Sequence, residues 1–301
     1  MTETTISQDN VDPATGTSKT FFGHPRGLVI LFFTEMWERF SYYGMRGLLI
    51  FYLTQHFLFS DERSTIMYGA YTALVYVMTI IGGSLADKYL GSRKAVTFGA
   101  ILLVLGHFGM AFEGNGSRQI MSLNGEEYQL TLDGRGGDAN QIIISDLGVS
   151  RISFSEGATN MLIAEPAVVG LPASIPTNSY TLRVETEEFY LNILYLSLGL
   201  IIAGVGFLKA NISTIVGALY GYGDARRDSG FTIFYMGINL GAFLSSLTCG
   251  ILGIVYGWKY GFGLAGIGMA MGLVVFLKYQ DWLEGKAEPP SEEKLKEKVI
   301  G

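Results

Sequence analysis

Along this 301-residue chain, long runs of apolar residues alternate with polar segments. A helix needs about 20 mostly apolar residues to cross a bilayer. Six runs reach or approach this length and predict six membrane-spanning helices. The expected ranges are 27–57, 66–85, 95–112, 189–220, 231–256 and 262–279. The first range is longer than a simple span requires, which predicts a tilted helix.

The polar stretch between the third and fourth runs has a different pattern. Apolar and polar residues partly alternate there, and turn signals such as Asn124-Gly125 separate some of the alternating segments. The segments are 128–133, 141–145, 151–155 and 180–185. This pattern is typical of strands and hairpins. We therefore expect a small β-rich extracytoplasmic domain, and the alternative is a flexible glycine-rich loop.

Basic residues in the short loops predict the orientation, because cytoplasmic loops carry an excess of Lys and Arg. One side of the bundle carries Lys88, Arg93, Lys94, Arg226, Arg227, Lys278 and Lys286. The short loops on the other side carry Arg63 and Lys259. We expect a multi-pass protein of the cell inner (plasma) membrane, with both termini of this segment cytoplasmic. The predicted order is a cytoplasmic tail at 1–26, spans at 27–113, the insert at 114–188, spans at 189–280 and a cytoplasmic linker at 281–301.

Composition narrows the possible functions. Hydrophobic residues make up 49% of the chain and charged residues 16%, below the roughly 25% charged residues of soluble domains. The net charge of −6 argues against nucleic acid as a partner. The single Cys249 forms no disulfide framework within the chain, and the three histidines show no ligand spacing. No nucleophile–base pair, phosphate loop or metal cluster is visible, so the sequence predicts neither an enzyme nor a bound cofactor or metal.

The first predicted helix carries charges that membrane helices rarely contain. Each ionised residue at the centre of such a helix costs about 2.5–3.5 kcal/mol on insertion scales. Counted from Glu35, the positions +3, +4, +7 and +11 lie on one stripe of the helix, and they are occupied by Glu38, Arg39, Tyr42 and Arg46. Tyr43 lies beside this stripe. The stripe predicts one wall of a central cavity, with Glu35 and Arg39 as an i,i+4 ion pair. The alternative is a set of salt bridges that only hold helices together.

Polar residues in three other predicted helices are further candidates. Lys209 lies deep in the fourth helix and is expected to pair with the glutamates of the first, with snorkelling to an interface as the alternative. Asn239 in the fifth helix is expected either to bind a substrate backbone or to bond a neighbouring helix beside Gly237 and Gly241. Tyr76 in the second helix is either a cavity hydroxyl or an ordinary buried tyrosine.

Three motifs in these helices resemble those of the proton-dependent oligopeptide transporter (POT/PTR) family within the major facilitator superfamily. Residues 35–44 resemble its ExxERFxYYG motif, and residues 234–241 resemble its second signature, FYxxINxG. Residues 82–94 resemble the superfamily's loop motif between the second and third spans. The resemblance implies an all-α integral membrane protein, the N-terminal six-helix bundle of a major facilitator fold. The β-rich insert between spans three and four is not part of the common family pattern.

The resemblance also implies a role for each candidate residue. The proton-coupling residues are Glu35, Glu38, Arg39 and Lys209. The substrate-binding residues are Arg39, Tyr42, Tyr43, Arg46, Tyr76, Lys209 and Asn239, with the three cations receiving a peptide carboxylate. Asp87 and Arg93 belong to the cytoplasmic gate. Animal members carry a histidine at the position of Gly69, so coupling here cannot use that imidazole.

These roles imply a proton-coupled symporter of di- and tripeptides that works by alternating access, with protons as the coupling ion. The expected partners are small peptides, the lipid bilayer and a C-terminal six-helix bundle that this segment lacks. The segment alone is therefore expected to be incomplete. Two alternatives stay open: a transporter of a non-peptide solute such as nitrate on the same scaffold, and a membrane-anchored receptor that uses the β insert.

Overall fold

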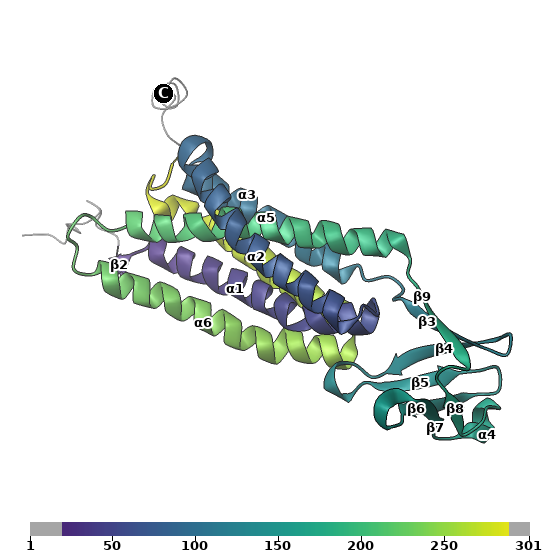
Figure 1. The fold of residues 1–301 in the computed structure, drawn as a ribbon. Coiled ribbons are helices and arrows are strands. Elements are labelled where there is room, and N and C mark those ends of the chain that lie inside the picture. Colours follow the sequence, from purple (N-terminus) through teal and green to yellow (C-terminus); the bar gives the residue numbers. More distant parts are fainter. Residues whose placement is uncertain (1–19, 289–301) are drawn as a thin grey trace, which may run out of the picture.

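The computed structural model describes residues 20–288, which form a bundle of long helices with a β domain at one end (Figure 1). Residues 1–19 of the predicted tail and 289–301 of the predicted linker lie outside the described residues. The long helices are α1 (Gly27–Phe51), α2 (Asp61–Leu85), α3 (Ser92–Ala111), α5 (Glu188–Ala218), α6 (Arg227–Ile251) and α7 (Trp258–Tyr279). A two-stranded hairpin, β1 (Thr20–Phe21) and β2 (His24–Pro25), precedes α1.

Short π-helical segments lengthen three of these helices, and a 3-10 turn follows a fourth. They are η1 (Tyr52–His56), η2 (Ala86–Leu90), η5 (Leu252–Tyr256) and η6 (Gln280–Leu283). With these extensions, α2, α3, α5, α6 and α7 are long and apolar enough to cross a membrane. Helix α1 is long enough but is not apolar enough to be included, because the charged residues Glu35, Glu38 and Arg39 interrupt its apolar sequence. That α1 also spans the membrane stays a prediction.

Glycines set the closest approaches between the helices. Helix α2 crosses α5 where Gly82 faces the backbone of Gly206, so that a side chain at Gly82 would overlap the Gly206 carbonyl. Helix α6 crosses α1 where Gly241 lies against the carbonyl of Met36. Backbones approach this closely only at the smallest residues. The bundle is built by these crossings together with the packing of α3 on α5 and of α7 on α1 and α3.

Helices α2 and α6 lie at the edge of the bundle. Their apolar segments are less buried than those of α3, α5 and α7. Large apolar side chains such as Ile80 and Phe243 are more than 60% exposed. Within the described residues, each of these two helices therefore has one face that no other helix covers.

The predicted β-rich residues form a seven-stranded antiparallel sheet in the order β8-β7-β6-β5-β4-β3-β9. The strands are β3 (Arg118–Leu123), β4 (Glu126–Asp133), β5 (Asn140–Ile144), β6 (Val149–Phe154), β7 (Asn160–Ile163), β8 (Ser174–Pro176) and β9 (Tyr180–Glu185), and a short helix, α4 (Pro166–Val169), lies between β7 and β8. Alternate residues such as Met121, Leu130 and Ile143 point to one face and form a separate apolar core. Because the sheet has its own core, the insert is a packed domain and not a flexible loop.

The insert leaves and re-enters the bundle at one place. Its first and last strands pair with each other, and the hydroxyls of Ser117 and Thr186 lie 2.7 Å apart. A second contact is reciprocal: the Gln55 side chain donates to the Gly136 carbonyl and accepts from the Gly136 amide, both at 2.8 Å. The sheet is therefore fixed to the end of α1 as well as to its own chain connections.

Candidate functional site

The acidic and basic residues of the α1 stripe are buried together. Glu35 is 2% exposed, Glu38 is 0% and Arg39 is 4%. The Nε atom of Arg39 lies 2.9 Å from Oε1 of Glu35, to which it donates a hydrogen bond, and 2.5 Å from Oε2 of Glu38. One guanidinium therefore serves two carboxylates that have almost no contact with solvent.

The cluster contains more polar atoms than its members can satisfy. Both carboxylate oxygens of Glu38, one of Glu35, one terminal nitrogen of Arg39 and the Thr34 hydroxyl are buried without a hydrogen-bond partner. Oε2 of Glu38 is close to Arg39 but is not aligned with an N–H bond. Buried polar groups of this kind cost free energy until a partner arrives. The arrangement can accept a proton on either acid or a polar group at Arg39.

Aromatic residues continue the stripe toward the β domain. The guanidinium carbon of Arg39 lies 5.5 Å from the ring centre of Tyr42, which itself packs edge-on against Tyr43. Further along α1, Nε of Arg46 donates to the hydroxyl of Tyr68 on α2 at 2.6 Å. The predicted stripe is therefore bordered by α2 near Arg46.

Two residues that the sequence analysis did not single out, Tyr68 and Tyr71, lie where α2 meets the α1 stripe. Tyr71 is 3% exposed, and its hydroxyl has no hydrogen-bond partner. It lies within electrostatic range of Tyr42, Glu38 and Arg46. The spacing of Tyr68, Tyr71 and Tyr76 at 0, +3 and +8 places all three near one face of a helix, and that spacing was the available signal.

Lys209 differs from its expected arrangement. Its ammonium lies 5.0 Å from the ring centre of Tyr76, and within the described residues no carboxylate is at ion-pair distance. Helix α5 nevertheless places Lys209 within electrostatic range of Glu38. The predicted direct pair between Lys209 and the α1 glutamates is therefore absent from this structure, because a cation–π contact with Tyr76 holds the ammonium.

Asn239 is bonded within its own helix. Its amide nitrogen donates to the Tyr235 carbonyl at 3.1 Å, and the residue is exposed on the uncovered face of α6. The alternative of an interhelical hydrogen bond is not what the structure shows. The packing part of that alternative is present, since Gly237 and Gly241 lie against α1.

The loop motif between α2 and α3 makes a tight turn at Gly91, whose φ of +75° favours glycine. Asp87 lies in η2, and Arg93 lies in the first turn of α3. The guanidinium of Arg93 pairs with Glu288, and its backbone amide donates to the Ala287 carbonyl at 3.1 Å. The two predicted gate residues thus flank one turn, and the segment after α7 is attached to that turn.

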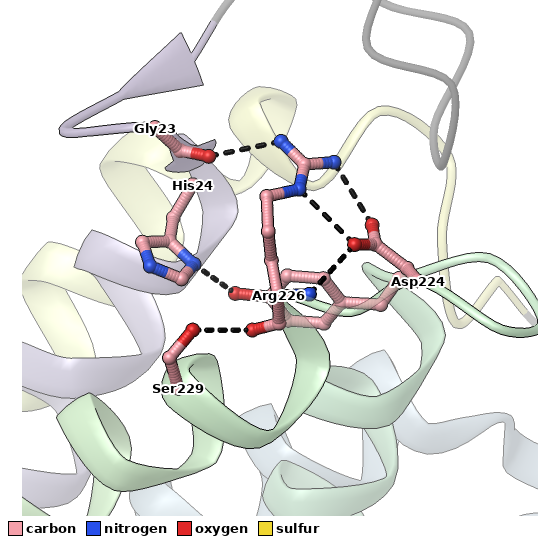
Figure 2. Close-up of polar contacts among 6 residues, drawn as sticks. Gly23, His24, Asp224, Arg226 and Ser229 are labelled. Atoms are coloured by element: carbon pink, nitrogen blue, oxygen red, sulfur yellow. Dashed lines mark hydrogen bonds and ion pairs between the residues drawn. The ribbon is translucent and has the colours of Figure 1, made fainter.

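A second polar cluster lies at the same end of the bundle (Figure 2). Arg226 donates to the Gly23 carbonyl at 2.9 Å and to both carboxylate oxygens of Asp224. These hydrogen bonds lower the pKa of Asp224. His24 shares a hydrogen bond of 2.9 Å with the Tyr220 hydroxyl, and burial together with nearby Arg226 lowers the pKa of His24. The cluster fixes the hairpin before α1 to the loop between α5 and α6.

No group of three or more His, Cys, Asp and Glu side chains within residues 20–288 could hold a metal ion. The expectation that the protein needs no metal or cofactor stays a prediction. The site that the structure offers is instead a buried cluster of charges on α1, with tyrosines of α1 and α2 and the half-buried Lys209 of α5 near it.

Comparison with known proteins gives consistent relatives. A model of the POT family matches residues 93–300. The uncharacterized transporter YclF of Bacillus subtilis (strain 168) is 37% identical over 263 residues, covering 86% of this chain and 38% of that protein. The di-/tripeptide transporter of Lactococcus lactis subsp. lactis (strain IL1403) is 33% identical over 267 residues, covering 86% and 39%. These relatives are transporters, in agreement with the expectation that the chain is not an enzyme.

Solved structures are similar as well. The crystal structure of the peptide transporter POT in complex with sulfate has a TM-score of 0.64 and 33% identity, covering 94% of this chain and 44% of that one. A POT family transporter in complex with 5-aminolevulinic acid gives a TM-score of 0.60 at 32% identity, covering 94% and 45%. The chain thus spans less than half the length of the proteins it matches.

Proposed function

The chain belongs to the POT family, and from this membership and the buried cluster of α1 we propose that it takes part in proton-coupled symport of di- and tripeptides. A second six-helix unit completes the cavity in this proposal. The uncovered faces of α2 and α6 support this, since they flank the stripe-bearing helix and have no partner within the described residues.

The observation that carries the proposal is Arg39 held between Glu35 and Glu38 in a site with almost no solvent. Protonating one acid removes its attraction for the guanidinium. Arg39 then has positive charge available for the carboxylate of a peptide, and a guanidinium binds a carboxylate through paired hydrogen bonds. The proton and the peptide therefore favour the same state of the cluster, which is the differential affinity that coupled transport requires.

The proposal places the protein in the plasma membrane with the α5–α6 loop on the cytoplasmic side. Arg93, Arg226 and Arg227 lie at that end of the bundle, whereas the β domain lies at the opposite end (Figure 1). An excess of basic residues marks the cytoplasmic side. Protons then enter from the side of the β domain and move down their gradient with the peptide.

The test of coupling is peptide-driven proton flux in proteoliposomes made with the protein expressed from its complete gene. Glu38→Gln is the informative variant, since it keeps the shape of the side chain and removes the titrating group. Glu127→Gln is the matched control, because Glu127 is exposed on the β domain and pairs only with Arg183 among the described ion pairs. We expect Glu38→Gln to lose accumulation of dialanine against a gradient. Unchanged accumulation with unchanged pH dependence would refute the assignment.

The substrate class is tested separately. Uptake of labelled dialanine should compete with unlabelled di- and tripeptides and should not compete with nitrate. Competition by nitrate alone would favour a non-peptide solute on the same scaffold. If nitrate is the solute, the proton-coupling test is repeated with nitrate in place of dialanine.

A further inference from the structure

The two arginines of the α1 stripe are bound in different ways. Arg39 is enclosed by two carboxylates, whereas Arg46 has no carboxylate at ion-pair distance among residues 20–288. The partner of Arg46 is the neutral hydroxyl of Tyr68, which accepts from Nε at 2.6 Å. The positive charge of Arg46 is therefore not neutralised by an ion pair in this structure.

The contact with Tyr68 uses only one edge of the guanidinium. Arginine carries five N–H bonds in a planar fork, and Nε contributes one of them. When Nε is held, the edge formed by the two terminal nitrogens stays available for a carboxylate. The guanidinium carbon also lies 5.4 Å from the Tyr68 ring centre, so the aromatic ring restrains the same group. Tyr68 thus fixes the direction of Arg46 and leaves its charge intact.

A second observation points to a ligand at the same border. The Tyr71 hydroxyl is buried one helical turn from Tyr68 and lacks any hydrogen-bond partner. Buried hydroxyls in proteins are nearly always bonded. A polar group bound beside Arg46 would supply the missing partner. Helices α1 and α2 make few direct contacts, and the hydrogen bond between Arg46 and Tyr68 is one of the links between them.

We propose that Tyr68 is a positioning residue for carboxylate recognition: it holds Arg46 so that the terminal nitrogens receive the C-terminal carboxylate of the transported peptide. This inference rests on the proposed function and adds to it a residue outside the motif of α1. Tyr68 acts through Arg46 and does not itself contact the carboxylate.

The test compares two ligands that differ only at the carboxylate. Dissociation constants of dialanine and of its C-terminal amide are measured by calorimetry on the purified full-length protein. The wild-type protein should prefer dialanine. Tyr68→Phe should reduce that preference about tenfold, the effect of losing one hydrogen bond to a charged group. The amide should bind the variant and the wild type equally, since it makes no ion pair with Arg46.

Tyr195→Phe is the control, because the Tyr195 hydroxyl accepts from Arg63 at 3.2 Å in an exposed contact away from the stripe. It should leave the preference unchanged. Arg46→Lys should reduce the preference by itself, and Tyr68→Phe added to Arg46→Lys should reduce it no further. Arg46→Lys alone keeps Tyr68 and removes the planar fork, so an unchanged preference in that variant would overturn the inference even if Tyr68→Phe folds poorly.

The outcomes separate the two proposals. If the wild-type protein binds neither ligand, the proposed function fails. If it prefers dialanine and Tyr68→Phe keeps that preference, or weakens both ligands equally, Tyr68 is only a structural link between α1 and α2 and this inference fails.

Discussion

Arg39→Met tests whether one cation holds the two buried acids of α1. Methionine keeps an unbranched side chain of similar length and removes the charge. Arg39 contacts both Glu35 and Glu38, so the variant leaves two carboxylates buried without the cation that the structure places between them. We expect a marked loss of stability and recovery when the acids are neutralised.

The magnitude follows from the burial of the three side chains. Removing one partner of a buried ion pair costs about 3–5 kcal/mol, because the remaining charge stays desolvated. All three residues are at most 4% exposed, so solvent screens little of the repulsion that remains. For a chain of this size the loss should lower Tm by on the order of 10 °C. Neutralising both acids in the background of Arg39→Met should restore most of the loss, because a fully neutral cluster has no unpaired charge.

Thermal unfolding in detergent with a thiol-reactive dye is the assay, since the sole cysteine of these residues, Cys249, is fully buried. The destabilisation should shrink as the pH is lowered, because protons then neutralise the acids that Arg39 no longer balances. A variant with the Tm of the parent protein would refute the reasoning. So would a triple variant, Arg39→Met with Glu35→Gln and Glu38→Gln, that is no more stable than Arg39→Met.

Three further predictions concern the scaffold. Replacing residues 118–185 by a short Gly-Ser linker should leave dialanine uptake largely intact, because the ends of the insert are adjacent; abolished function would favour the receptor alternative. Gly241→Leu should lower Tm, since α1 backbone fills the space beside it, whereas Gly199→Ala meets open space and should not. Arg226 lowers the pKa of Asp224, so their contact stabilises the fold at neutral pH and is lost as pH falls through the lowered folded pKa. Arg226→Ala should remove this pH dependence in hydrogen exchange at residues 20–26.

The helices could be predicted from the sequence because each is an apolar run, but their starts could not be located from apolarity alone. Helix α2 begins at Asp61, five residues before the predicted start at position 66, because the Ser60 hydroxyl caps it by accepting from the Arg63 amide at 3.2 Å. Cap residues are polar and fall outside a window that measures hydropathy. Helix α7 likewise begins at Trp258, before the predicted position 262.

The α1 stripe was predictable because helical geometry alone places residues at +3, +4, +7 and +11 on one face. The partners of the stripe were not, since they depend on how α1, α2 and α5 pack. Sequence reasoning assigned Lys209 to the acids, whereas packing gives it Tyr76, and it assigned Arg46 to the substrate without its link to Tyr68. The structure corrects the pairing of Lys209, whereas the substrate role of Arg46 stays a prediction to which the Tyr68 contact is added. A tyrosine can hold a cation through its ring and its hydroxyl without neutralising the charge. Cations held in this way keep their charge for an incoming anion, whereas cations held by carboxylates need a proton to release them. The described site contains both kinds, since Arg39 lies between two carboxylates whereas Arg46 and Lys209 contact tyrosines.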